Sequence, residues 1–248
     1  MADELHDTGG KVRLHVEAAL SDGARVVLED AQAHYLLHVM RAKTGARVSL
    51  FNGRDGEWLA RVAETAKRSC TLVGERQTRA QDATPDVWLC FAPVKKTPAD
   101  YVVQKATELG VRALQPVFTR RTIVTRINEE RMKANAIEAA EQSERLTVPE
   151  IREAVTLDKL LRAWPRERSV LFCDEGGDAQ PIAKAAAKID TNSIAILTGP
   201  EGGFDPAERD AIRSQSFVVP VTLGPRILRA DTAALASLAI WQALRGDS

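Results

Sequence analysis

The carboxyl-terminal two thirds of the chain alternates strand-length apolar runs with stretches of helical periodicity. The apolar runs are VWLCF, ALQPVF, SVLFC, SIAIL and FVVPVTL. Apolar runs without polar alternation are typical of parallel strands that helices cover on both faces. Because strands and helices alternate along the chain, the pattern predicts an α/β domain with a parallel sheet over residues 85–248. Its helices are expected to start at Asn128, Thr156 and Asp178, and the last one follows Asp231 as its N-cap.

Residues 11–80 follow a different pattern, in which short alternating strands are separated by turns. This pattern predicts a small β-barrel domain. One amphipathic helix is expected within it, with Asp30 as its N-cap and with Leu36, Leu37 and Met40 on its apolar face. The polar stretch that follows, residues 78–86, is typical of a linker.

The first ten residues are acidic and polar and lack the apolar stretch of a secretory signal, which predicts a flexible tail over residues 1–10. No apolar run in the chain approaches the roughly 18 residues that a membrane span needs. Lys plus Arg equal Asp plus Glu at 34 each, so the net charge favours no class of partner. We therefore expect a cytoplasmic protein without a membrane partner.

Cysteine and histidine usage limits the chemistry. The three cysteines, at positions 70, 90 and 173, are far apart and odd in number, which is typical of reduced thiols. All four histidines precede residue 39, which argues against Ser–His or Cys–His nucleophilic catalysis in the α/β domain. His34 and His38 are four residues apart on one expected helix, but no third ligand accompanies them, so no metal site is expected.

Two loops rich in glycine and proline follow consecutive strands of the α/β domain. The first, TGPEGGF, follows SIAIL and ends at Asp205, Pro206 and Glu208, which carry the signals of a helix start. The second, LGPRIL, also joins a strand to a helix. Glycines at the carboxyl edge of a parallel sheet let backbone groups approach a ligand. The two loops therefore predict one shared site, and neither matches a GxGxxG or GxxxxGK[ST] motif.

Two basic stretches contain no acidic residue, one between Ala31 and Arg54 and one between Leu109 and Asn128. Clustered cations in a neutral protein favour contact with the phosphates of a nucleic acid, although two ordinary solvated faces remain an alternative. The candidate RNA contacts are Arg13, His34, His38, Arg41, Lys43, Arg120 and Arg121.

Four segments in order resemble the ribosomal RNA small subunit methyltransferase E family. They are APVKKTPADYVVQKATELGV, EAAEQSERLTVPEI, LTGPEGGFDPAE and LGPRILRADTAALASLAIWQ, and the resemblance covers nearly the whole chain. It implies a PUA-like RNA-binding domain over residues 11–80 and a SPOUT methyltransferase domain with a deep trefoil knot over residues 85–248. It also implies a homodimer that methylates N3 of uridine 1498 in 16S rRNA, with the assembled small ribosomal subunit as the substrate.

The resemblance also implies that S-adenosylmethionine binds between the two glycine-rich loops. The implied cofactor-binding residues are Leu197, Thr198, Gly199, Pro200, Gly203, Leu223, Gly224, Ile227 and Leu228. Methylation of N3 requires removal of its proton, for which Asp231 or Glu201 is a candidate base, while Arg229 is a candidate to stabilise charge on a uracil oxygen. Family members commonly have Glu where this chain has Asp231, so the identity of the base stays open.

Two alternatives remain. Another SPOUT methyltransferase, acting on tRNA or on a ribose 2′-hydroxyl, would share the cofactor loops but not the VQKATELG and AAEQSER helices. A non-catalytic RNA-binding protein would keep the β domain beside a degenerate α/β domain, but the glycines of both loops are intact.

Overall fold

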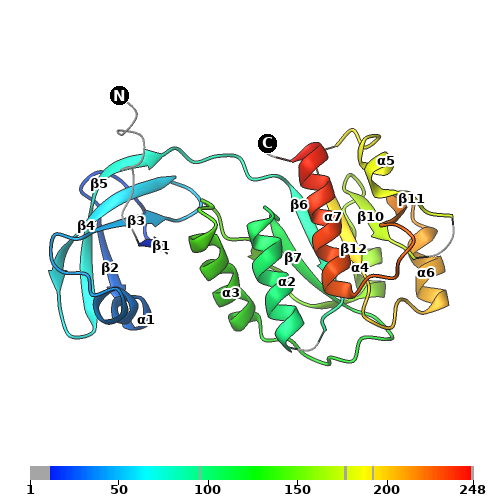
Figure 1. Ribbon diagram of the computed structural model, residues 1–248, viewed down its shortest axis with the longest axis horizontal. Coiled ribbons are helices and arrows are strands. Elements are labelled where there is room, and N and C mark those ends of the chain that lie inside the picture. Colours follow the sequence, from blue (N-terminus) through cyan, green and yellow to red (C-terminus); the bar gives the residue numbers. More distant parts are fainter. Residues whose placement is uncertain (1–11, 95, 176–177, 192, 247–248) are drawn as a thin grey trace. The chain divides into compact units, whose positions relative to one another are not determined.

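A computed structural model describes residues 12–94, 96–175, 178–191 and 193–246. The chain divides into two compact units (Figure 1). The first comprises residues 1–83 together with 140–147, and the second comprises residues 84–139 and 148–248. The expected flexible tail, residues 1–10, lies outside the described residues. No helix formed by the described residues is long and apolar enough to cross a membrane.

The first unit contains a curled five-stranded sheet with the order β1-β3-β4-β5-β2. Its strands are β1 (Arg13–His15), β2 (Arg25–Glu29), β3 (Arg47–Phe51), β4 (Glu57–Thr65) and β5 (Ser69–Arg79). β1 pairs with β3 in parallel, and the other pairs are antiparallel. Register shifts between β4 and β5 increase the local twist, and β1 and β2 stand at the two edges of a half-barrel. The sequence predicted these strands and a small β-barrel, whereas the described strands form a half-barrel.

The helix of this unit differs from the expectation. α1 (Asp30–His34) continues as a π-helix, η1 (Tyr35–Val39). The N-cap prediction for Asp30 is wrong, because Glu29 holds the cap position and Asp30 has a φ of 42° and pairs with Arg68 at 2.5 Å. The prediction that Met40 lies on the apolar face is also wrong, because its side chain is 41% exposed. The wider π turn, in which the Met40 N–H donates to Tyr35 O at 2.9 Å, shifts Met40 off the apolar face, whereas Leu37 still packs against the core.

The second unit is built on a sheet in which every described strand pair is parallel, as predicted. The strand order is β11-β13-β10-β12-β6-β7-β8, and β9 pairs with β7 beside this path. The strands are β6 (Val87–Phe91), β7 (Ala113–Phe118), β8 (Glu150–Ile151), β9 (Val155–Thr156), β10 (Ser169–Cys173), β11 (Gln180–Pro181), β12 (Ile194–Thr198) and β13 (Val218–Thr222). The two-residue strands β8, β9 and β11 were not predicted.

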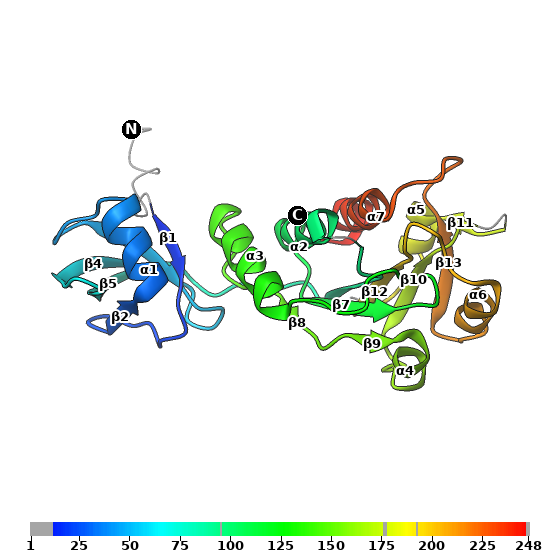
Figure 2. The same ribbon diagram turned by 90° about the horizontal axis from the view of Figure 1, so that it is seen from below.

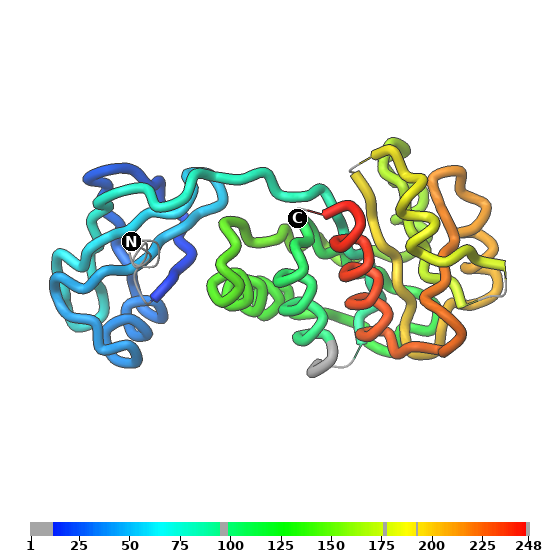
Figure 3. The backbone as a smooth tube through the Cα atoms, turned by 45° about the horizontal axis from the view of Figure 1, so that its top comes forward, coloured from blue at the N-terminus to red at the C-terminus, as the bar shows by residue number. Residues whose placement is uncertain are grey.

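Helices cover both faces of this sheet (Figure 2). One face carries α2 (Lys96–Glu108), α3 (Glu129–Gln142), α5 (Ile182–Ala186) and α7 (Ala230–Arg245), and the other carries α4 (Leu157–Arg162) and α6 (Pro206–Arg213). Alternate strand residues supply the two cores: Ile196 packs with Trp241 of α7, whereas Leu197 packs with Ile212 of α6. α7 lies beside α2 (Figure 3), where the Gln242 side chain donates to Leu109 O at 2.6 Å.

Three predicted helix starts are confirmed. Asp205 caps α6, with Pro206 at the first position and Glu208 completing a capping box. Asn128 and Thr156 accept hydrogen bonds from the first turns of α3 and α4.

Two helix-start predictions are wrong. α5 begins at Ile182, after β11, and not at Asp178, whose side chain pairs with Arg213. α7 begins at Ala230 with Arg229 in the cap position, so Asp231 is not its N-cap.

Candidate functional site

Three adjacent strands of the second unit end at a pocket. The loops after β12 and β13 both line it, as the sequence predicted. The two strands are not neighbours, however, because β10 lies between them and pairs with both. The pocket is lined by Cys173, Asp174, Glu175, Thr198, Gly199, Pro200, Glu201, Gly203, Phe204, Val221, Thr222, Leu223, Gly224, Pro225, Arg226, Ile227, Leu228, Ala230 and Ala233.

Glycine is required where these loops approach their neighbours. A Cβ at Gly199 would lie 2.7 Å from the ring of Phe204, which is anchored edge-on against Phe172 at 5.2 Å. Gly203 and Gly224 have φ values of 66° and 116°, which side chains rarely permit. The loops therefore present backbone groups to the pocket, with little side-chain cover.

Of the nine expected cofactor-binding residues, eight line this pocket: Thr198, Gly199, Pro200, Gly203, Leu223, Gly224, Ile227 and Leu228. Leu197 is the exception. Its side chain is 1% exposed and packs in the core shared with α4 and α6. Because Leu197 lies inside β12, paired with β6 and β10, it supports the loop from below without lining the pocket.

The sequence interpretation missed the residues at the end of β10. Cys173, Asp174 and Glu175 all line the pocket. Burial raises the pKa of the Cys173 thiol to about 12, against the lowering effect of a hydrogen bond with Ser237, so this cysteine is not a thiolate nucleophile at neutral pH. In the sequence, these residues were marked only by the polar, glycine-containing run that follows SVLFC. The strand order is what places this run between the two glycine-rich loops.

Asp174 ties this part of the pocket wall to α6. Its side chain is 2% exposed and accepts hydrogen bonds from Arg209 Nε at 2.8 Å and Arg213 Nε at 2.6 Å. Arg213 also pairs with Asp178. Hydrogen bonds to Asp178 and Asp174 raise the pKa of Arg213 well above its ordinary value. The ion pairs therefore fix α6, and with it the end of the first glycine-rich loop, against β10.

The three candidate catalytic residues come together in an adjoining cavity. Glu201, Arg229 and Asp231 line it with Val94, and it shares Glu201, Ile227, Leu228 and Ala230 with the pocket. Glu201 and Arg229 are exposed, whereas Asp231 is half-buried and accepts a hydrogen bond from the Thr232 N–H at 2.7 Å. Two carboxylates and a guanidinium beside the pocket can accept a proton and stabilise a developing negative charge.

Four of the candidate RNA contacts lie on the first unit and are exposed: His34, His38, Arg41 and Lys43. The rings of His34 and His38 are 5.0 Å apart. Among the described residues, no group of three or more His, Cys, Asp or Glu side chains is arranged to hold a metal ion.

Arg13 is placed differently from these residues. Its side chain is 11% exposed, pairs with Glu57 at 2.5 Å and donates to the carbonyls of Ala140 and Arg145 at 2.9 and 2.5 Å. Burial lowers the pKa of Arg13, although the hydrogen bond to Glu57 opposes this. Arg13 therefore holds segment 140–147 to the first unit, and its guanidinium is largely buried in these contacts.

Arg120 and Arg121 lie beside the pocket, in the turn after β7. Arg120 Nη1 pairs with Asp205 at 2.8 Å, and Arg121 Nη1 donates to the carbonyl of Gly202 at 2.8 Å. Both side chains are exposed. The structure therefore connects the second basic stretch with the first glycine-rich loop.

Two family models match the chain. A model of an RNA methyltransferase domain matches residues 81–242, and a model of an RNA methyltransferase PUA domain matches residues 28–73. The ribosomal RNA small subunit methyltransferase E of Rickettsia conorii is 31% identical over 229 residues, which cover 92% of this chain and 93% of that protein. The protein of the same name from Synechocystis is 34% identical over 227 residues, covering 89% and 74% of the two chains.

Solved structures show the same relationship. A ribosomal RNA small subunit methyltransferase E from Neisseria gonorrhoeae, bound to S-adenosyl methionine, is 29% identical with a TM-score of 0.85, covering 94% of this chain and 97% of that one. A putative methyltransferase from Legionella pneumophila, in complex with the bound cofactor SAM, is 25% identical with a TM-score of 0.84 and the same coverage. The family models and these relatives, together with the parallel sheet and the PUA domain, show that the chain belongs to the ribosomal RNA small subunit methyltransferase E family.

Proposed function

We propose that this chain binds S-adenosylmethionine in the pocket and methylates N3 of uridine 1498 in the 16S rRNA of the small ribosomal subunit. The observation that carries the proposal is that both glycine-rich loops line one pocket and that Glu201, Arg229 and Asp231 line the cavity joined to it. Two similar solved structures, from Neisseria gonorrhoeae and Legionella pneumophila, are described as bound to this cofactor.

The pocket has the chemistry that this cofactor requires. Leu223, Ile227 and Leu228 offer apolar contacts for an adenine ring, and Gly199 and Gly224 bring main chain without a side chain to the pocket wall. When bound, the cofactor supplies an electrophilic methyl group on a positively charged sulfonium. The carboxylates of Glu175, after β10, and Glu201, in the first loop, line the pocket and favour a positive charge there.

The chain's own residues then have two tasks in the reaction. N3 of uracil must lose its proton as the new N–CH₃ bond forms, and we assign Asp231 as the acceptor, with Glu201 as the second candidate. Arg229 is placed to stabilise negative charge on a uracil carbonyl oxygen. The loops contribute mainly proximity and orientation, which is the larger requirement of an in-line displacement.

We further propose the architecture that the resemblance implies: a PUA-like RNA-binding domain over residues 11–80, and a methyltransferase domain over residues 85–248 with a deep trefoil knot, assembled as a homodimer in the cytoplasm. The strand order is compatible with such a domain, since β12 inserts between β6 and β10, which precede it in the chain. Sedimentation of the purified protein at the mass of a monomer, about 27 kDa, would contradict the homodimer.

The test is methyl transfer in vitro. Small ribosomal subunits from cells that lack this protein are incubated with the enzyme and methyl-labelled cofactor, and the nucleosides are then separated. The proposal predicts label in N3-methyluridine alone. Label in a 2′-O-methylated nucleoside, or on tRNA and not on subunits, would favour another SPOUT methyltransferase, and no transfer to any RNA would favour a non-catalytic RNA-binding protein.

A further inference from the structure

We propose that Arg121 is a positioning residue that holds the cofactor loop, which is the first glycine-rich loop, residues 198–204. We propose that it thereby couples RNA binding to cofactor binding. The proposal rests on the proposed function, because it takes the first glycine-rich loop as part of the cofactor site. Arg121 belongs to a basic stretch for which the sequence alone predicts only a contact with RNA.

The turn that carries Arg121 is closed by hydrogen bonds between Thr119 and Thr122. The Thr119 N–H donates to Thr122 Oγ1 at 2.9 Å, the two hydroxyl groups are 2.9 Å apart, and the Thr122 N–H donates to Thr119 O at 3.1 Å. Thr119 is buried. Hydrogen bonds of this kind close the turn at both ends, so its two central arginines are held in a defined direction.

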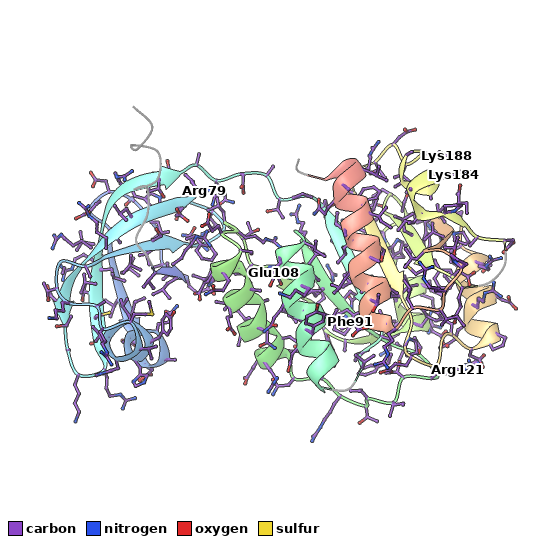
Figure 4. The ribbon with its side chains drawn as sticks, in the orientation of Figure 1. Arg79, Phe91, Glu108, Arg121, Lys184 and Lys188 are labelled. Carbon is purple, nitrogen blue, oxygen red and sulfur yellow. The ribbon has the colours of Figure 1, made fainter. Side chains whose placement is uncertain are left out.

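Three contacts attach this turn to the first glycine-rich loop and to α6, the helix that follows it. The Arg120 N–H donates to the buried carboxylate of Glu208 at 2.8 Å, and the Arg120 side chain pairs with Asp205. Arg121, labelled in Figure 4, donates to the carbonyl of Gly202 at 2.8 Å. Glu208 also accepts from the Asp205 N–H at 3.2 Å, so the same carboxylate closes the capping box of α6 and anchors the turn.

The contact with Gly202 is the one that reaches the cofactor loop directly. Gly202 lies between Glu201 and Gly203, which both line the pocket. A Cβ at Gly202 would lie 3.7 Å from Cβ and Cδ of Arg121, so the arginine stem covers this residue at van der Waals distance. The left-handed conformation of Gly203, with a φ of 66°, follows immediately. Arg121 therefore restrains the loop at the point where the chain turns.

The same arginine is available to RNA. A guanidinium has five N–H donors, and the bond to Gly202 uses Nη1. The Arg121 side chain is exposed, so its other donors can reach a phosphate while the bond to Gly202 is kept. A phosphate that immobilises this side chain also immobilises the loop, and the cofactor then binds a loop that is already ordered. By linkage, RNA and cofactor each raise the affinity of the other by the same factor.

The test uses calorimetry with S-adenosylhomocysteine on the full-length wild type, Arg121→Ala and Arg121→Lys. Arg126→Ala is the matched control, since Arg126 is an exposed arginine of the same stretch and no described bond joins it to the loop. We expect Arg121→Ala to raise the Kd about threefold to tenfold, the range for one charge-assisted hydrogen bond at an exposed site, and Arg121→Lys to recover part of the loss. Arg126→Ala should leave the Kd unchanged.

The second arm repeats the titrations with small ribosomal subunits from cells that lack this protein. Subunits should tighten S-adenosylhomocysteine binding to the wild type and have little effect on Arg121→Ala. Three results would each overturn the proposal. The first is an equal S-adenosylhomocysteine affinity for Arg121→Ala and the wild type, and the second is an equal loss of affinity in Arg121→Ala and Arg126→Ala. The third is that subunits tighten S-adenosylhomocysteine binding to Arg121→Ala as much as to the wild type. Failure of the wild type to bind S-adenosylhomocysteine would instead contradict the proposed function. Thermal unfolding of each variant separates loss of binding from loss of folding.

Discussion

At the scale of single residues, the chemistry depends on a few side chains whose surroundings the structure defines. Asp231 is half-buried in the first turn of α7, where its carboxylate accepts from the Thr232 N–H and faces the cavity that Glu201 and Arg229 also line. Cys173, although it lines the pocket, is held as a neutral thiol by burial. These surroundings support the proposal that a carboxylate, and not the cysteine, accepts the proton.

Replacing these carboxylates by amides tests the assignment. Asp231→Asn should lower kcat by about 10²-fold or more, because general base catalysis typically contributes that much. Glu201→Gln is the matched control, with a smaller expected loss. Asp231→Glu should keep most of the activity, since it keeps the carboxylate. S-Adenosylhomocysteine affinity, measured for each variant, should change little, and near-normal turnover in Asp231→Asn would refute its role as the base.

At the scale of elements, opposite edges of the parallel sheet have different tasks. The carboxyl ends of β12, β10 and β13 form the pocket. The amino ends are held by Asp86, which precedes β6 and accepts from Arg168 Nη2 and Ser193 Oγ, both at 2.7 Å. Arg168 also donates to the carbonyl of Ile194 at 3.1 Å and lies over the ring of Trp88 at 4.0 Å. These contacts join the amino ends of β6, β10 and β12, at the edge of the sheet opposite the pocket.

Asp86→Asn should therefore destabilise the protein in a pH-dependent way. Burial would raise the pKa of Asp86, but hydrogen bonds from Arg168 and Ser193 outweigh burial and hold it below its usual value. Because the folded pKa is depressed, the stabilisation is complete above the unfolded pKa of about 3.9 and is lost as the pH falls below it. We expect a loss of roughly 2 kcal/mol in the free energy of unfolding at pH 7.

Urea unfolding of both proteins between pH 7 and pH 3 measures this difference. It should stay constant from pH 7 to about pH 5 and shrink below about pH 4. A difference that persists unchanged at pH 3 would show that packing, and not the carboxylate charge, is responsible. Asp190→Asn, a substitution at an exposed residue of the same unit, is the control.

The sequence predicted the parallel sheet, the capping box of α6 and most of the pocket, because these depend on local patterns. Apolar runs, helix caps and glycine-rich loops act over a few residues and can be recognised without a structure. The end of β10 could not be found in this way, since its place between the two loops depends on strand order. The π turn after Leu36 and the bond from Arg121 to Gly202 also depend on tertiary structure.

At the scale of the whole molecule, the described contacts divide the basic residues into two groups. His34, His38, Arg41 and Lys43 are exposed on the first unit, and among the described residues no ion pair joins Arg41 or Lys43 to an acid. Arg120 and Arg121 are bonded to the cofactor loop and the start of α6. Segment 140–147 also belongs to the first unit, although it lies within the stretch predicted as the methyltransferase domain.

The first group should therefore affect RNA binding alone. Arg41→Ala with Lys43→Ala should weaken binding to small ribosomal subunits and reduce the slope of log K against log salt by about one for each phosphate contact that is lost. S-Adenosylhomocysteine affinity should not change, in contrast to Arg121→Ala. Filter binding at several salt concentrations measures the slope, and an unchanged slope would mean that these residues do not contact phosphates.

The measurement that tests the central claim most directly is primer extension across position 1498 of 16S rRNA from cells that contain or lack this protein. A methyl group on N3 blocks the Watson–Crick edge of uracil, so reverse transcriptase should stop beside this nucleotide in the parent cells. We predict that the stop disappears when the protein is absent, returns with the wild-type protein and does not return with Asp231→Asn. A stop that persists in cells without the protein would contradict the proposed activity.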